Sequence, residues 1–341
     1  MPLLYWPAYL LIWKALLTNR FPFRAKARLA LFLLKDLLKQ PLWAFLWGLD
    51  AVLFPAYKRM KVERPIFIVS QPRSGTTFLH RTLCDFEERF FGVTYLEWHW
   101  PFVSVWWLID ALGLRSWIES WDYWPEGCLA SKMHPHKFGD FEEHGVFLEE
   151  QFYCHYFVYR RFPFPEVIAV ADLLIFTTEK QRTKMARSLL SVVSKVQVYR
   201  AAGKRWVAKE NETMAFYDDL AAQCDRPSWI LLERNYDDMI KSYDQLSLYS
   251  TAAKTGVWME NWNYGQWWSL NRAFRSTEIH RYAFIKDAVT DGLPVRYEWM
   301  VADISETVLN LLVGLGEAPT GAYLVYLEEL DEKQKTRKRG Y

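Results

Sequence analysis

The alternation of apolar and polar positions divides the chain into an N-terminal arm and a longer region in which strands alternate with helices. Residues 2–18 and 41–57 are almost entirely apolar, and a basic amphipathic segment lies between them. Each apolar run is at or below the length of about 17 residues that a membrane-spanning helix needs, and each contains a charge and a proline. The pattern favours a helical arm over residues 1–62 that lies on a membrane surface or packs on the rest of the chain.

After the arm, short apolar and β-branched runs predict the strands of a sheet, at residues 65–70, 205–210, 227–235 and 295–299. Helical periodicity separates these runs, most clearly over residues 141–162, 179–202 and 258–280. Strands that alternate with helices predict a parallel sheet covered by helices on both faces. We therefore expect an α/β domain over residues 63–330, followed by a basic tail at 331–341.

Charge and cysteine content narrow the class of protein. The chain of 341 residues carries 42 Lys and Arg against 40 Asp and Glu, so its overall charge gives no reason to expect a nucleic-acid partner. The four cysteines are far apart and contain no CxxC pair, which predicts neither a zinc site nor a disulfide framework. Any anion-binding site must therefore arise from a local cluster of residues.

The corner between the first predicted strand and the following helix carries such a cluster, in the sequence QPRSGTTFLHRTL. The backbone N–H groups at a helix N-terminus and the helix dipole favour an anion. Gly75 allows the backbone to approach closely, Ser74, Thr76 and Thr77 add hydroxyl donors, and Arg73 adds a cation. We interpret this corner as a phosphate cradle.

The cradle differs from the loop of nucleoside triphosphatases. The pattern GxxxxGK[ST] would need a lysine at the position of Thr76 and a glycine near Ser70. No strand that ends in aspartate follows to hold magnesium, so the usual electrophile for phosphoryl transfer is missing. We expect a cradle that works without a metal.

A second motif, ILLERNYDDMIKSYDQL, places Arg234 at the end of a predicted strand and Ser242 in the next helix. Together the two motifs resemble those of sulfotransferases that use 3′-phosphoadenosine 5′-phosphosulfate (PAPS). In that family the first loop holds the 5′-phosphosulfate, and the Arg and Ser hold the 3′-phosphate. The chain departs from the family at Asn235 and Tyr236, where a proline is usual after Arg-Asp. The resemblance implies a P-loop-like parallel sheet flanked by helices.

Four further segments are similar to the bacterial and tyrosylprotein-sulfotransferase-like branch of that family: VTYLEWHWPF, MHPHKFGDFEEHGVFLEE, RWVAKE and VRYEWMVADISETVLNLLVGLG. The resemblance implies that Glu97, four residues ahead of Pro101, is the base that takes the acceptor's proton. Glu143 and His134 remain alternatives for this role. An amphipathic helix over 141–162 would equally explain the acidic residues of the second segment.

The resemblance also assigns cations and cofactor contacts. Lys209, at the end of a strand, would steady the leaving oxygen, and Arg73 would contact the 5′-phosphate and take part in catalysis. Tyr297 would line the cofactor pocket. The family's basic loop near the C-terminus has no full match here, and Lys338 or Arg339 of the tail could replace it.

We therefore predict a PAPS-dependent sulfotransferase that forms PAP as its product, uses no metal and acts on a hydroxyl or amine. A hydrophobic or lipid-like small molecule is the favoured acceptor, because the Trp-rich span at 98–124 offers only Arg115 as a cation. A kinase-like nucleotide-binding protein and a non-catalytic membrane-associated binder are the alternatives. A cytoplasmic protein that touches a membrane through residues 1–60 is favoured over a Golgi-type signal anchor, and the oligomeric state stays open.

Overall fold

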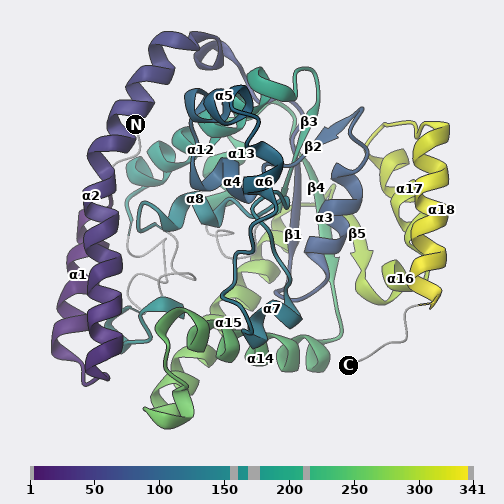
Figure 1. Ribbon diagram of the computed structural model, residues 1–341. Helices are drawn as coiled ribbons and strands as arrows, with labels where there is room; N and C mark the ends of the chain where they lie inside the picture. Colours follow the sequence, from purple (N-terminus) through teal and green to yellow (C-terminus); the bar gives the residue numbers. More distant parts are fainter. Residues whose placement is uncertain (1–3, 154–159, 168–176, 210–215, 337–341) are drawn as a thin grey trace.

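Five parallel strands form one sheet in the computed structural model, which describes residues 4–153, 160–167, 177–209 and 216–336 (Figure 1). The strands in chain order are β1 Ile66–Ser70, β2 Phe90–Phe91, β3 Arg205–Lys209, β4 Ser228–Glu233 and β5 Leu293–Arg296. Their order in the sheet is β2-β3-β1-β4-β5. β1 is central: Ile66 pairs with Val207 of β3 on one side and with Ser228 of β4 on the other. The predicted α/β fold is confirmed.

Helices cover both faces of the sheet, as the sequence predicted (Figure 1). One face carries α3 Thr76–Cys84, α16 Tyr297–Ala302, α17 Ile304–Gly314 and α18 Gly321–Thr336. Between the other face and the arm lie α4 Tyr95–His99, α5 Val103–Ala111, α8 Gly145–Glu149, α12 Glu179–Arg200 and α13 Tyr217–Ala221. Ile66 and Ile68 of β1 pack against the helices of the first face. Phe67 and Val69 pack against those of the other face, because successive side chains of a strand point to opposite sides.

α1 and α2 form the arm, and further helices lie outside the two groups that cover the sheet (Figure 1). The bounds of all these helices are α1 Trp6–Thr18, α2 Phe23–Leu53, α6 Arg115–Glu119, α7 Leu129–Met133, α14 Tyr236–Thr255 and α15 Tyr264–Ala288. Short 3₁₀ turns occur at Pro55–Arg59, Pro165–Val167 and Met259–Asn261. Residues 92–136, which are rich in aromatic side chains, contain four short helices, α4 to α7.

Three predicted elements are wrong in their extent. The helix expected over 258–280 begins at Tyr264 and continues to Ala288, because a separate 3₁₀ turn occupies Met259–Asn261. The strand expected over 295–299 ends at Arg296, and α16 begins at Tyr297. The helix expected over 141–162 is interrupted, because α8 ends at Glu149 and Phe152 has a φ of 61°. The buried ring of Phe152 packs edge-on against Tyr9 of α1 at 5.2 Å, so a contact distant in sequence accompanies the break in the helix.

The arm is a hairpin of α1 and α2 that packs along one side of the domain (Figure 1). α2 continues through Pro41, whereas the sequence suggested a separate apolar segment from that residue onward. A proline removes a single hydrogen bond to the preceding turn. On either side of it, Asp36 and Trp43 of α2 are buried in the molecule, which favours a continuous helix.

The outer face of α2 is apolar although it faces solvent. Exposed side chains recur at helical spacing, at Leu31, Leu34, Leu38, Leu42 and Phe45. Within the described residues, none of the helices combines the length and the apolar character that a membrane span requires. That the arm meets a membrane surface through residues 1–60 stays a prediction.

Candidate active site

The phosphate cradle lies where the sequence placed it, between the carboxyl end of β1 and the N-terminus of α3. Gly75, the residue before the helix, has a φ of 88°, a left-handed conformation that only glycine adopts freely. A Cβ at this position would lie 2.7 Å from the ring of Tyr297. Gly75 is therefore required both for the turn and for the close approach of Tyr297.

The two motifs that suggested a bisphosphate site are in direct contact. Arg73 donates from Nε to Oγ of Ser242 at 3.0 Å, and Arg234 donates from Nη1 to the carbonyl oxygen of Arg73 at 2.9 Å. The Arg234 guanidinium also lies 4.3 Å above the ring of Tyr297. Residues more than 160 positions apart thus line one site, at the edge of the sheet where α/β proteins bind ligands.

Two buried polar atoms at this site fit an anion. Ser74 Oγ and Arg234 Nε are shielded from solvent and have no hydrogen-bond partner within the described part of the chain. An unpaired buried donor is costly, and a bound phosphate oxygen would satisfy it. Together with the glycine turn, these donors form a site suited to phosphate groups.

Lys209 links the cradle to a pair of acidic residues. It ends β3 beside β1, and its side chain is buried. Its Nζ donates to Thr77 Oγ1 at 2.9 Å and lies 2.7 Å from Glu143 Oε1. Glu142 Oε1 is farther away, at 4.0 Å. Lys209 therefore lies between the phosphate cradle and a carboxylate.

His134, His136 and Glu142 adjoin Lys209; His136 and Glu142 are buried and His134 is half-buried. With Lys209 and Glu143 they form the Lys209 cluster. His136 Nδ1 lies 3.1 Å from Glu142 Oε2. Burial alone would raise the pKa of Glu142, but the neighbouring cations, Lys209 among them, hold the pKa of this carboxyl below its usual range, whereas burial lowers the pKa of both histidines. The two histidines and Glu142 therefore combine a carboxylate with neutral imidazoles at neutral pH. Their three potential ligand atoms lie within 4.8 Å of one another, so they could also hold a metal ion.

The contacts of Glu97 differ from those expected of a base. Its buried carboxylate receives two hydrogen bonds from Arg200, at 2.6 and 2.7 Å, and a third from the backbone N–H of Thr94 at 2.9 Å. Both oxygens are thus engaged in an ion pair and a capping box that fix α4. The partner, Arg200, is the last residue of α12. The role of Glu97 as the base stays a prediction.

Two residues near Lys209 were not singled out from the sequence. Glu142 Oε1 lies 4.0 Å from Lys209 and His136 contacts Glu142, whereas the sequence pointed only to His134 and Glu143 as alternative bases. The signal was present in the HPHKFGDFEE pattern, whose histidines and glutamates the fold brings together. Lys338 and Arg339, the suggested replacements for the basic loop, lie outside the described residues.

Comparison of the chain with models of known protein families decides its family. A model of the sulfotransferase family matches residues 65–318, which cover the sheet, the cradle and the Lys209 cluster. The chain belongs to the sulfotransferase family. A search of curated proteins gave no match by sequence.

Two solved sulfotransferases share the fold of this sulfotransferase over nearly its whole length. STF1 from Mycobacterium tuberculosis H37Rv aligns with a TM-score of 0.68 and 15% identity, over 97% of this chain and 92% of its own. STF9 from Mycobacterium avium aligns with a TM-score of 0.72 and 13% identity, over 96% of this chain and 82% of its own. At such low identity the likeness concerns the fold.

Buried histidines behind the site predict sensitivity to acid. Burial, with His80 and Lys209 nearby, lowers the pKa of His144 to about 3. An unfolded chain binds this proton near pH 6.5, so the stability that the neutral ring contributes is present above pH 6.5 and is lost as the pH falls. At pH 5 this one residue costs about 2 kcal/mol.

We expect His144→Phe to unfold at a lower pH than the native chain, as followed by circular dichroism during acid titration. His280 is exposed, and His280→Phe should leave the midpoint unchanged. Equal midpoints for His144→Phe and the native chain would contradict the proposed effect.

Proposed function

We propose that the chain transfers a sulfuryl group from PAPS to a hydroxyl or amine of a hydrophobic acceptor. The contact between Arg73 and Ser242 carries this proposal, because it unites the cradle with the second anion motif in one site. The backbone and hydroxyls of residues 73–77 would hold the 5′-phosphosulfate. Arg234 and Ser242 would hold the 3′-phosphate.

The Lys209 cluster suits the chemical step. PAPS supplies a sulfuryl group bonded to a phosphate that leaves as part of PAP. Glu143 would accept the proton of the acceptor hydroxyl or amine, since its carboxylate lies beside Lys209. Lys209 and Thr77 would stabilise the negative charge that develops on the leaving phosphate, where buried donors are most effective. Arg73 would orient the phosphosulfate.

The neighbouring histidines position Glu142 in this scheme. His136 is in contact with Glu142, whose backbone carbonyl accepts a hydrogen bond from the indole of Trp98 at 2.9 Å. These two contacts fix the backbone next to Glu143. A rigid framework of this kind keeps a base in place between substrate and cation.

Ligand binding tests the donor. PAP is expected to raise the melting temperature of the native chain, and at 100 times its Kd the gain corresponds to about 2.7 kcal/mol. ATP with magnesium and NAD should give much smaller shifts. Ser242→Ala should weaken the response to PAP, whereas Ser269→Ala, at an exposed position of α15, should not.

Two outcomes would contradict the donor assignment. A shift with ATP and magnesium but none with PAP would favour the kinase-like alternative, and a chelator would then abolish turnover. Stabilisation by PAP without sulfuryl transfer to any of a panel of phenols, alcohols and amines would favour the non-catalytic binder. For a sulfotransferase that works without a metal, a chelator should leave turnover unchanged.

A further inference from the structure

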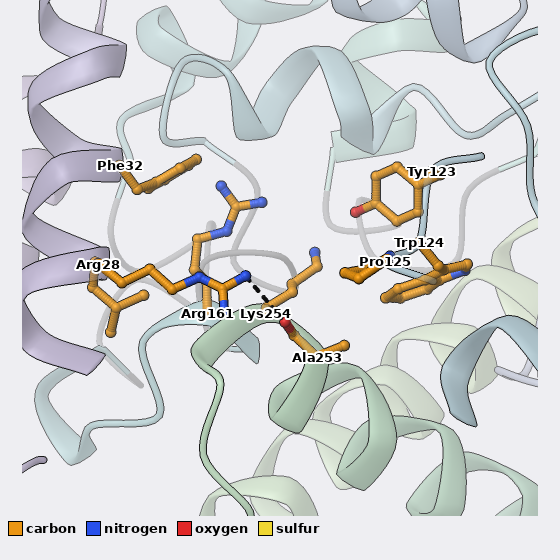
Figure 2. Close-up of a pocket in the computed structure, with 9 residues that line it drawn as sticks. Arg28, Phe32, Tyr123, Trp124, Pro125, Arg161, Ala253 and Lys254 are labelled. Carbon is orange, nitrogen blue, oxygen red and sulfur yellow. Dashed lines mark hydrogen bonds between the residues drawn. The ribbon is translucent and has the colours of Figure 1, made fainter. Parts of the chain in front are cut away.

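A cavity of about 230 Å³ lies between the arm and the carboxyl edge of the sheet, outside the cradle. Figure 2 shows Arg28 and Phe32 on the side of α2, Tyr123 and Trp124 across from them, and Arg161 and Lys254 between the two sides. These residues come from four distant parts of the sequence. The fold alone brings them together.

The cavity contains more positive than negative charge. Three cations line it: Arg28, Arg161 and Lys254. Glu149 neutralises part of this charge, since its Oε1 lies 2.8 Å from Arg161 and 3.9 Å from Lys254. Asp36 of α2 also interacts electrostatically with Arg161. Among the described residues, these two carboxylates face three cations, so the cavity keeps an attraction for an anion.

The walls of the cavity are aromatic. The guanidinium of Arg161 lies 3.6 Å above the ring of Phe32, and Tyr123 and Trp124 form the opposite side. Aromatic rings offer apolar contact area, whereas the cations around them favour a charged group. This combination suits an amphiphile with an anionic end and an apolar body.

The aromatic wall connects the cavity to the Lys209 cluster. Tyr123 donates its backbone N–H to the carbonyl of His136 at 2.9 Å, and the indole of Trp124 donates to the carbonyl of His134 at 2.8 Å. The rings of Tyr123 and His136 are 5.5 Å apart. The segment with Tyr123 and Trp124, which line the cavity, is thus hydrogen-bonded to the segment with His136, which lies beside Glu142.

We propose that this cavity is the acceptor subsite, and that the acceptor carries an anionic group such as a carboxylate or phosphate at some distance from its reacting hydroxyl or amine. The inference rests on the proposed function. It changes the acceptor expected from the sequence, where Arg115 was the only cation noticed near the aromatic span. Arg28, Arg161 and Lys254 lie outside that span and could not be placed there from the sequence.

Calorimetric titration with three probes that share a ten-carbon chain tests the cavity: decanoate, decanol and decyltrimethylammonium. We expect decanoate to bind at least about tenfold more tightly than either of the others. Arg28→Gln with Lys254→Gln should remove most of this preference. Arg24→Gln, one turn earlier on α2 and exposed, is the matched control and should keep it.

A second measurement ties the cavity to the acceptor. Among ω-hydroxy acids of 8, 12 and 16 carbons, the best substrate should exceed the diol of equal length in kcat/KM by about tenfold. The double variant should lose this advantage through a higher KM, with the response to PAP unchanged.

Equal affinity for decanoate and decanol would overturn the proposal, as would the same loss of preference in Arg24→Gln as in the double variant. So would diols that are turned over as well as the acids, or no turnover of any acid. Failure of PAP to stabilise the native chain would instead remove the proposed donor, and the decanoate titration would still report on the cavity.

Discussion

Replacement of Glu143 by Gln is expected to lower kcat for sulfuryl transfer by about 10²–10⁴, the usual contribution of a positioned general base. The amide keeps the shape of the side chain and can still accept a hydrogen bond from Lys209, which lies 2.7 Å from Glu143 in the native chain. It cannot take up the acceptor's proton. Single-turnover assays with labelled PAPS measure this step, and PAP binding reports on the fold of the site.

Lys209→Met should lower kcat by about 10²–10³ by removing a buried donor near the leaving phosphate. The two losses should not add, because both side chains act on the same transition state.

Glu97→Gln is the decisive comparison for the choice of base. Its carboxylate is held by two hydrogen bonds from Arg200 and one from Thr94, so its loss should weaken the anchoring of α4 and lower the stability of the fold. Turnover by the folded fraction should stay within a few-fold of the native value. If Glu97→Gln instead abolishes turnover in a folded protein while Glu143→Gln retains it, the base is Glu97.

The parts of this site that could be predicted from the sequence are local in the chain. Gly75 and the hydroxyl residues around it indicate a strand-to-helix turn that binds anions, because a glycine between an apolar run and a helical period is typical of such turns. Lys209 was placed correctly because it ends a short apolar strand, and strand ends meet at one edge of a parallel sheet.

What could not be predicted depends on partners that are far apart in the sequence. Glu97 and Arg200 are separated by 103 positions, and nothing local to Glu97 distinguishes a buried ion pair from a catalytic carboxylate. The continuity of α2 through Pro41 also depends on distant contacts. A proline favours a break in a helix, whereas packing on the domain keeps this helix continuous. The charges of the cavity likewise converge only in the fold.

Asp50 shows that the arm is part of the folded domain. In the sequence it interrupts an apolar run near the end of the arm, but in the structure it is fully buried at the end of α2. Its oxygens accept hydrogen bonds from the backbone N–H groups of Val103 and Ser104 at 2.8 and 2.9 Å, at the start of α5. Lys195 of α12 lies 2.9 Å from the same carboxylate and 3.7 Å above the ring of Trp47.

Asp50→Ala is therefore expected to lower the free energy of unfolding by about 3–5 kcal/mol, because it leaves the buried charge of Lys195 without its partner. Urea unfolding, followed by circular dichroism, measures the change. Asp291→Ala, at an exposed turn, should cost less than about 1 kcal/mol, as is usual for a surface substitution.

The double variant Asp50→Leu with Lys195→Met separates the two roles of the carboxylate. Apolar residues of similar volume can replace a buried ion pair without loss, so the charge-related part of the cost should be recovered. The N–H groups of Val103 and Ser104 would remain unpaired, leaving a residual cost of about 1–3 kcal/mol for each buried donor. If Asp50→Ala is as mild as Asp291→Ala, the arm contributes little to the stability of the domain, and its apolar residues must be explained by contacts outside the chain.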